Sequence, residues 1–382
     1  MAVPQPLALP PRESDNMTNV IRLLVCAVGV AVAGVSSAAQ RTFVASYGLS
    51  ANTAFNCSIS KPCRSFGEAI SVTDAAGEVV VLDSAGYGPV TITQSVSIIA
   101  PAGVYAGVSV FSADGIVVSA GPSGNVVLRG LTINGQGGAR GIVHVTGGRV
   151  DIDRCIVSGM TGNGIEVGAG AGAITIADTV VERNGGHGIQ FIDRVSGVST
   201  GQLTSVRSAN NAFRGLFIGA GAQVRISSSV FHGNGTGGVW ALTGTSNPQP
   251  VILDLSRSVV SANGSEGVVV VVQGGAATFM QALITGNVVT DNAVAGIEIG
   301  MSSAAAGGAR AVITGNEVRG HFIGIAANRA NTQVILNGNA VAQASGNGIQ
   351  IQNGAIVRSR GDNVVDDNAT NQVGAAVPVN VM

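Results

Sequence analysis

A short pattern of apolar and polar positions recurs about ten times between residues 126 and 377. Each copy begins with glycine, continues with a branched apolar residue and any residue, and ends in most copies with a second apolar residue. Successive glycines of this pattern, here named anchor glycines, are 23, 24, 27, 23, 29, 29, 28 and 24 residues apart. They are Gly141, Gly164, Gly188, Gly215, Gly238, Gly267, Gly296, Gly324 and Gly348.

Each repeat also contains an alternation of apolar and polar residues ahead of the anchor, as in Ile174-Thr175-Ile176 and Val224-Arg225-Ile226. A period of two is typical of β-strands, and the helical period is absent from these repeats. One repeat is too short to bury its own apolar face. We therefore expect successive repeats to stack as the coils of a solenoid.

Two polar columns support this register. Four residues ahead of an anchor glycine stand Asn184, Asn211, Asn234, Asn263 and Asn292. Nine residues ahead stand Thr179, Ser229, Ser258, Asn287 and Asn339, with Asn316 one position out of step. Because identical amides in stacked parallel strands can bond along the column, we interpret these residues as structural ladders.

The spacing separates this fold from two other solenoids. A leucine-rich repeat needs a recurring leucine framework, which this chain lacks. A left-handed coil of hexapeptides needs a period of about 18 residues, shorter than the spacings here. The predicted fold class is all-β, a right-handed parallel β-helix with a short N-terminal capping helix, the hand being that expected for parallel crossovers.

The chain is expected to have three segments: an extension with a signal peptide at 1–39, a first strand with a cysteine loop and capping helix at 40–78, and the β-helix at 79–382. Arg22, the apolar run 23–35 and Ser37-Ala38-Ala39 are typical of a secretory signal that starts at Met17. The apolar run is too short for a membrane span. We therefore expect a secreted or periplasmic protein with no membrane span in the mature chain.

The cysteines fit that compartment. Cys57 and Cys63 bracket a short loop that contains Pro62, and we expect them to form a disulfide. Cys155 has no partner in the sequence and is expected to be a buried small hydrophobe. Next, Ser65-Phe66-Gly67-Glu68 has the spacing of a capping box, which predicts a short helix over the open end of the solenoid.

Charge narrows the set of partners. Only 11% of the residues are charged, the formal net charge is -1, and Lys61 is the single lysine. A protein without a basic excess is not expected to bind nucleic acid.

The N-terminal part of the chain resembles a known group. Arg41-Thr42-Phe43-Val44-Ala45-Ser46-Tyr47-Gly48, Lys61-Pro62-Cys63-Arg64-Ser65-Phe66 and Gly77-Glu78-Val79-Val80-Val81-Leu82 are similar to the first module of bacterial right-handed β-helix proteins in the pectate-lyase-like superfamily. The later asparagine-rich coils resemble its generic repeats. This resemblance implies the fold rather than an activity, because the superfamily includes lyases, hydrolases, epimerases and adhesins.

A lyase of this superfamily implies an acidic calcium site beside a basic residue. Asp151 and Asp153 alternate on one strand face, Asp178 follows in the next repeat, and Arg154 is adjacent. Neighbouring strands would bring these groups within about 5 to 8 Å, a spacing compatible with Ca²⁺. The alternative is a solvated face with balanced charge, so the catalytic residues stay open and Ca²⁺ is the only cofactor considered.

A hydrolase has less support. Gly186-His187-Gly188 resembles the Gly-His-Gly motif of polygalacturonases, but the aspartate motifs that supply their catalytic carboxylates are missing. We interpret His187 as a turn residue. The four histidines fall on different repeats, so we expect no metal cluster from them.

The residue two positions after each anchor glycine is predicted to face outward. This ladder places Phe217 beside Trp240, with Gln190 on the preceding coil, as candidate substrate-binding residues. Glu166 and Glu298 lie five coils apart, about 24 Å, too far to act as a catalytic pair. The longer repeats carry extra residues after the anchor strand, near 193–202, 243–250, 273–279 and 301–310, which marks one edge as the binding side.

These features favour a protein that binds a polysaccharide, with binding preferred over processing. Two alternatives stay open: a calcium-assisted polysaccharide lyase and a non-catalytic structural or adhesive surface protein. The ligand and the oligomeric state do not follow from the sequence.

Overall fold

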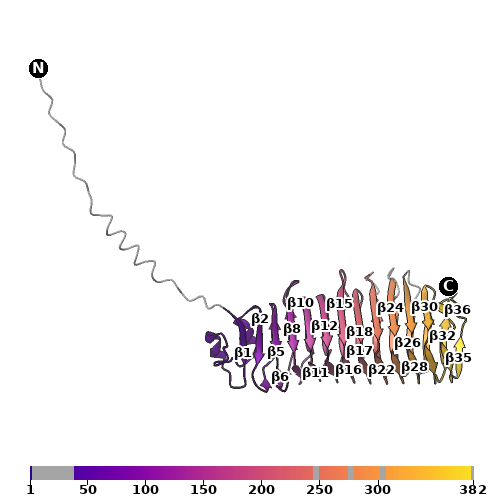
Figure 1. Cartoon of the computed structure of the whole chain (residues 1–382), viewed down its shortest axis with the longest axis horizontal. Coiled ribbons are helices and arrows are strands. Elements are labelled where there is room, and N and C mark those ends of the chain that lie inside the picture. Colours follow the sequence, from indigo (N-terminus) through magenta and orange to yellow (C-terminus); the bar gives the residue numbers. More distant parts are fainter. Residues whose placement is uncertain (2–37, 244–248, 274–278, 302–306, 380–382) are drawn as a thin grey trace. The chain divides into compact units, whose positions relative to one another are not determined.

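The structure, a computed structural model, describes residue 1 and residues 38–243, 249–273, 279–301 and 307–379. Ala39–Met382 forms one compact unit. Figure 1 shows the strands of this unit side by side along its long axis, as expected for a solenoid. Of the predicted signal peptide, only Met1, Ala38 and Ala39 belong to the described residues.

Each coil contributes strands to three parallel rows, here named the anchor, middle and short sheets. The first two are joined through the long strands β10 (Arg140–Asp153) and β12 (Ile165–Ala177) into one 24-stranded sheet, and the third is a separate 12-stranded sheet. The anchor sheet contains the strands that follow the anchor glycines: β4 (Val90–Ile92), β7 (Asp114–Ser119), β10, β12, β14 (Ile189–Phe191), β17 (Arg214–Ile218), β20 (Gly237–Leu242), β23 (Val268–Val272), β26 (Ala295–Met301), β29 (Ile323–Asn328), β32 (Asn347–Gln352) and β35 (Thr370–Val373).

The middle sheet comes next along each coil. It contains the second halves of β10 and β12, together with β1 (Ala39–Val44), β2 (Thr73–Val81), β5 (Val96–Ile99), β8 (Asn125–Arg129), β15 (Ser199–Thr204), β18 (Ala222–Ser227), β21 (Val251–Ser256), β24 (Phe279–Thr285), β27 (Gly308–Thr314), β30 (Thr332–Asn337), β33 (Ile356–Ser359) and β36 (Val377–Pro378).

The short sheet completes each coil. Its strands are β3 (Ala85–Gly86), β6 (Ala106–Val110), β9 (Leu131–Gly135), β11 (Ile156–Ser158), β13 (Val180–Glu182), β16 (Arg207–Ala209), β19 (Val230–His232), β22 (Val259–Ser261), β25 (Val288–Thr290), β28 (Glu317–Arg319), β31 (Ala340–Ala342) and β34 (Val364–Asp366). A single left-handed residue, such as Arg257 at φ 47°, turns the chain from the middle sheet into the short sheet.

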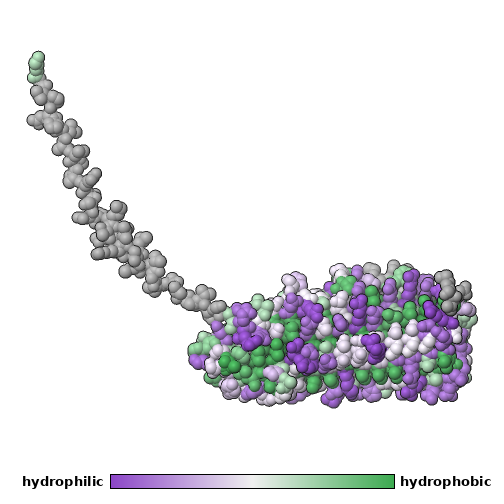
Figure 2. Space-filling model, in the orientation of Figure 1, coloured by the Kyte–Doolittle hydropathy of each residue, from purple (hydrophilic) through white to green (hydrophobic). Residues whose placement is uncertain are grey.

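The register agrees with the predicted repeat. Ile165 pairs with Ile189, and Ile189 pairs with Leu216 on the next coil. All three side chains are fully buried, so they form one column inside the solenoid. Rows of like colour along the long axis in Figure 2 show the same stacking on the surface.

The asparagine column four residues before the anchors forms a buried hydrogen-bonded ladder, as predicted. The Nδ2 of Asn184 donates to Oδ1 of Asn211 at 2.9 Å, and Asn211 donates likewise to Asn234 at 3.0 Å. Asn234 donates to Asn263 at 3.0 Å, and Asn263 donates to Asn292 at 2.7 Å. Each accepting Oδ1 also takes the backbone N–H of the preceding asparagine.

The second ladder is also formed, and it includes the residue that was out of step in sequence. Nδ2 of Asn287 donates to Oδ1 of Asn316 at 2.9 Å, and Asn316 donates to Asn339 at 3.0 Å. Ser258 joins through its backbone N–H, 2.9 Å from Oδ1 of Asn287. The turns thus compensate for the unequal repeat lengths.

The close stacking of the coils explains why the anchor residue is glycine, because a Cβ on each anchor from Gly141 to Gly324 would lie 2.5 to 2.9 Å from the carbonyl oxygen of the next anchor glycine. At several anchors the ladder adds a second close contact. A Cβ on Gly215 would lie 2.8 Å from Nδ2 of Asn234, and one on Gly188 would lie 2.6 Å from Nδ2 of Asn211. Contacts below 3 Å are not tolerated, so no side chain fits between the anchor and the asparagine of the next coil.

The N-terminal end is capped as predicted. α2 (Phe66–Ser71) begins with a capping box between Ser65 and Glu68. Cys57 and Cys63 form a disulfide, and η1 (Ser50–Phe55) lies in the loop before it. Because β1 pairs with β2, which spans Thr73–Val81, the predicted boundary at residue 78 falls inside a strand of the solenoid.

We predict that Asn263→Ala lowers the free energy of unfolding by roughly 3 kcal/mol, because it leaves buried amide groups of two neighbouring coils without partners. Urea unfolding followed by circular dichroism measures the change. Asn337→Ala is the control, since Asn337 lies on the outward face of β30 and its loss should cost less than about 0.5 kcal/mol. Equal losses in the two variants would contradict the ladder's role.

Candidate functional site

Two columns of side chains face outward from the anchor sheet. The predicted column, two residues after each anchor, is in register from Val143 through Gln350. A second column consists of the residue just before each anchor, including Arg140, Asn163 and Arg214. Contacts between the columns run diagonally, from one coil to the next.

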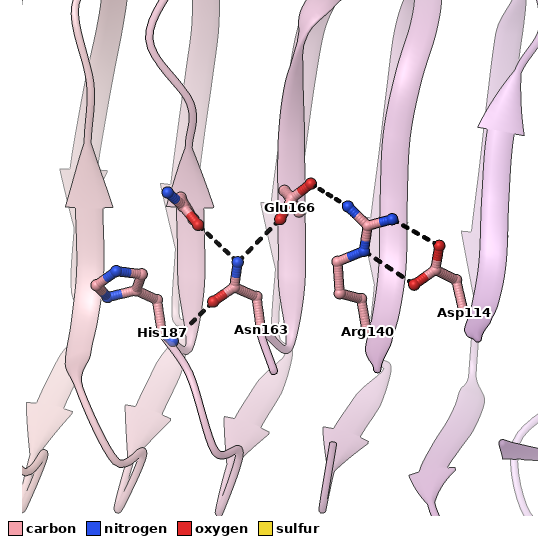
Figure 3. Close-up of polar contacts among 6 residues, drawn as sticks. Asp114, Arg140, Asn163, Glu166 and His187 are labelled. Atoms are coloured by element: carbon pink, nitrogen blue, oxygen red, sulfur yellow. Dashed lines mark hydrogen bonds and ion pairs between the residues drawn. The ribbon is translucent and has the colours of Figure 1, made fainter. Parts of the chain in front are cut away.

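The first part of this face is a polar network, shown in Figure 3. Arg140 binds Asp114 through two bonds of 2.9 and 2.7 Å and also pairs with Glu166. Nδ2 of Asn163 donates to Glu166 at 2.9 Å and to Oε1 of Gln190 at 2.6 Å. These charges are mutually satisfied, so this part serves as a rigid support for the coils that follow.

The aromatic pair predicted from the sequence lies on the next coils. Phe217 and Trp240 are register partners, and both are partly exposed. The Arg214 guanidinium lies 5.4 Å from the Phe217 ring centroid and 3.8 Å from that of Trp240. Phe217 also stacks with His187, with centroids 5.2 Å apart and planes 20° apart. The result is a continuous shelf of flat groups, here named the aromatic shelf: His187, Phe217, Arg214 and Trp240.

Burial and the nearby Arg214 charge lower the pKa of His187 to about 4, so the imidazole is neutral at physiological pH. Its Nδ1 accepts the backbone N–H of Arg214 at 3.3 Å, which places the ring proton on Nε2. Burial also lowers the pKa of Arg214. The sequence identified Phe217 and Trp240 but missed the roles of His187 and Arg214.

A carboxyl pair follows the shelf. Glu266 precedes an anchor glycine and Glu298 faces outward one coil later, the same relative positions as Asn163 and Gln190. Burial, together with the charge of Glu266, raises the pKa of Glu298. Glu166 is indeed five coils from Glu298. The partner of Glu298 is instead Glu266, which sequence reasoning missed because it followed a single outward column.

A pocket of about 340 Å³ joins Arg214 and Trp240 of the shelf to Glu298 of this carboxyl pair. It is lined by Arg214, Trp240, Leu242, Val269, Val271, Gln273, Glu298, Met301, Asn328 and Arg329. Three buried atoms at this place, Nε of Arg214, Nε1 of Trp240 and Oε2 of Glu266, make no hydrogen bond to any residue that the structure describes. Polar groups desolvated in this way are suited to bind a polar ligand.

The predicted loops are only partly described. Of the four, residues 193–202 lie wholly within the described chain, whereas the other three include residues 244–248, 274–278 and 302–306, outside it. In the first loop, Oδ1 of Asp193 accepts the backbone N–H of Ala220 at 2.8 Å, and Arg194 binds the carbonyl of Ala171.

The predicted calcium ligands are held by arginines instead. Asp151 pairs with Arg149 at 2.9 Å, and Asp153 pairs with Arg129 at 2.8 Å and with Arg154 at 3.3 Å. Asp178 occupies the left-handed turn after β12, at φ 47°. Across the described ranges, no three His, Cys, Asp or Glu side chains lie together as metal ligands. The arrangement is that of the charge-balanced face considered from the sequence.

Three further residues considered from the sequence, Cys155, His144 and His321, are buried in the structure. Cys155 is buried, and burial raises the pKa of its thiol to about 12, so it is an unreactive core residue. His144 points into the core between Val118 and Val167, where burial lowers its pKa to about 4. His321 accepts the backbone N–H of Asn292 at 3.0 Å and so occupies an asparagine position in the first ladder.

Comparison with known proteins assigns the fold. The family model "Right handed beta helix region" matches residues 104–251. No curated protein sequence matches the chain. The structure is similar to that of pectate lyase Pel9A, with a TM-score of 0.50 and 14% identity over 88% of this chain and 78% of the lyase.

Two further solved structures are similar. The A-module of the Azotobacter vinelandii mannuronan C-5 epimerase AlgE6 has a TM-score of 0.50 and 16% identity, over 80% of this chain and 91% of the module. The Dettilon tailspike protein has a TM-score of 0.57 and 14% identity, over 81% of this chain and 63% of the tailspike. At such identities the likeness is one of fold. The chain has a right-handed β-helix fold, which these solved structures share.

None of the helices among the described residues has the length and hydropathy needed to span a membrane.

We predict that Glu298→Gln raises the melting temperature at pH 7 but not at pH 4. A carboxyl whose folded-state pKa lies above its ordinary value of 4.5 destabilises the fold once the pH rises past that value, because the folded state then binds more protons than the unfolded state. Glu166→Gln is the control, since it removes the carboxylate that pairs with Arg140 and should lower the melting temperature at pH 7. A loss of stability at pH 7 in Glu298→Gln would contradict the assignment.

Proposed function

We propose that the protein binds a polysaccharide chain along the outward face of the anchor sheet. The observation that carries the proposal is the aromatic shelf, where Arg214 lies against both Phe217 and Trp240 and keeps a buried Nε–H without a partner among the described residues. Aromatic faces bind the apolar faces of sugar rings, and the free donors would bind hydroxyl or acidic oxygens.

The dimensions suit a chain rather than a single sugar. From Gln190 to Glu298 the outward column crosses four coil steps, about 19 Å at the spacing of parallel strands. Two of the similar structures are by name enzymes of polysaccharides, a pectate lyase and a mannuronan epimerase. Their likeness is one of fold and supports the ligand class only as an analogy.

Processing of the bound chain is a second candidate function, favoured by Glu298. A carboxyl that holds its proton to higher pH, beside the second carboxyl Glu266, has the property required of a general acid. The calcium-assisted lyase based on Asp151, Asp153 and Asp178 is not favoured, because Asp151 and Asp153 are paired with arginines. No specific contact favours a purely structural or adhesive role.

The proposed location is outside the cytoplasm. It is supported by the signal-like sequence before residue 40 and by the disulfide between Cys57 and Cys63, which persists in oxidising compartments.

We predict that Trp240→Ala weakens binding of the preferred polysaccharide by about tenfold, because the shelf loses its largest ring. A glycan array on the purified protein would find the ligand, and isothermal titration calorimetry would measure the affinity. Phe111→Ala removes an exposed aromatic away from the shelf and is the matched control. No ligand on the array, or the same affinity for both variants and the wild type, would overturn the proposal.

A further inference from the structure

The outward face of the middle sheet is hollowed along its length. Three hollows of about 480, 310 and 370 Å³ lie there, and each shares lining residues with the other two. Ile252 belongs to the first and second, Arg225 to the second and third, and Asp254 to the first and third. They form one continuous channel, here named the middle-sheet groove.

The groove is long, open and straight. It runs from Arg149 on β10 to Arg358 on β33, across strands such as β18, β24 and β30, which follow one another along the axis (Figure 1). Eight coil steps separate its ends, about 38 Å at the spacing of parallel strands. Such a track fits an extended polymer better than a compact small molecule.

Its side chains repeat in register. One outward column contains, on successive coils, Thr200, Gln223, Ile252, Gln281, Arg310 and Gln333. Its hydroxyl and amide groups can both donate and accept hydrogen bonds. The spacing of about 4.8 Å between coils is close to the length of one sugar ring in an extended chain. Because the three glutamines lie on every second coil, their amides can meet every second unit of a linear polysaccharide.

The charged side chains of the groove indicate the charge of its ligand. Arg149 is paired with Asp151 and Arg225 with Asp254, at 2.9 and 3.2 Å. Arg310 and Arg358 are exposed, and neither has a carboxylate partner within the described ranges. The groove thus carries two uncompensated positive charges, which favour an anionic ligand.

In the column that leads from Asp254 to Arg358, the three intervening residues are apolar. Leu283, Val312 and Ile335 are register partners on successive coils, with exposed fractions of 44%, 37% and 37%. Side chains of this size can contact the C–H faces of sugar rings. They form a narrow strip with arginine and glutamine beside it, less apolar than the buried centre of a permanent protein interface.

We propose that the middle-sheet groove binds a linear anionic polysaccharide, independently of the anchor-sheet face. The uncompensated Arg310 and Arg358 would pair with its acidic groups, the glutamines with its hydroxyls, and the apolar strip with its ring faces. The protein would then hold acidic chains on two separate faces or cross-link neighbouring chains.

The test measures binding of dextran sulfate and polygalacturonate oligomers by isothermal titration calorimetry, with uncharged dextran as the matched ligand control. The double variant Arg310→Gln with Arg358→Gln should weaken binding to the groove by at least roughly tenfold. Arg207→Gln makes the same type of charge change on the outward face of the short sheet and should have no effect. The experiment is done in the Trp240→Ala background, so that the proposed anchor-sheet site does not contribute.

The groove proposal is supported if an acidic oligomer binds in the Trp240→Ala background, dextran does not, and the double arginine variant loses that binding while Arg207→Gln retains it. It is overturned if no acidic oligomer binds in that background, or if the double variant binds unchanged. If the groove proposal is overturned, an acidic oligomer that binds the wild type but not the Trp240→Ala variant would still support the anchor-sheet function. Two other outcomes contradict the proposal. If single-stranded DNA of matched length binds with the same affinity as the acidic oligomer, the groove is assigned to nucleic acid. If the wild type is a dimer and Leu283→Glu makes it monomeric, the groove is assigned to a second copy of the chain.

Discussion

Hydrogen bonds between buried asparagines on successive coils hold this solenoid in register. In each ladder the Oδ1 of one asparagine accepts from both the backbone and the side chain of the preceding coil, so a slip of one residue would leave several buried polar groups without partners. The anchor glycines follow from the same close stacking, because a Cβ at Gly215 would meet both the amide of Asn234 and the carbonyl oxygen of Gly238. Glycine and asparagine, the two conspicuous residue types of the repeat, are therefore both required by the packing of successive coils.

The register of the coils determines which residues become neighbours on the surface. Residues 23 to 29 apart become register partners at strand spacing, and diagonal contacts between the two outward columns bring Arg214 to Trp240 and Glu266 toward Glu298. Unequal loops between the anchor and middle sheets leave the register intact, so a coil can vary its outward residues without disturbing the core. The two faces differ accordingly. The anchor sheet bears an aromatic shelf beside a carboxyl pair, whereas the middle sheet bears amides and unpaired arginines.

The sequence was sufficient for the fold because its signals are periodic or local. The strand alternation, both polar columns, the Ser65 capping box and the Cys57–Cys63 pair depend on nearby residues or on one repeat length.

The candidate site was predicted in part: Phe217 and Trp240 were identified, while Arg214, His187 and Glu266 were not. Those three occupy the position before an anchor and act diagonally on the following coil, a relation that only the structure displays. The candidate calcium ligands Asp151 and Asp153 are paired with Arg149 and Arg129, which is the charge-balanced alternative already considered from the sequence. The middle-sheet groove depends on side-chain lengths over eight coils and had no sequence signature.

The most direct test of the register is a pair of engineered cysteines on the outward anchor column. Gln190 and Phe217 are register partners, and the Cα spacing of about 4.8 Å between parallel strands lies within the range of a disulfide. The account predicts that Gln190→Cys with Phe217→Cys forms a new disulfide under native oxidising conditions, detected by mass spectrometry. It predicts none for Gln190→Cys with Trp240→Cys, two coils apart. Equal cross-linking in the two pairs, or cross-linking only in the second, would contradict the stacking on which both binding faces depend.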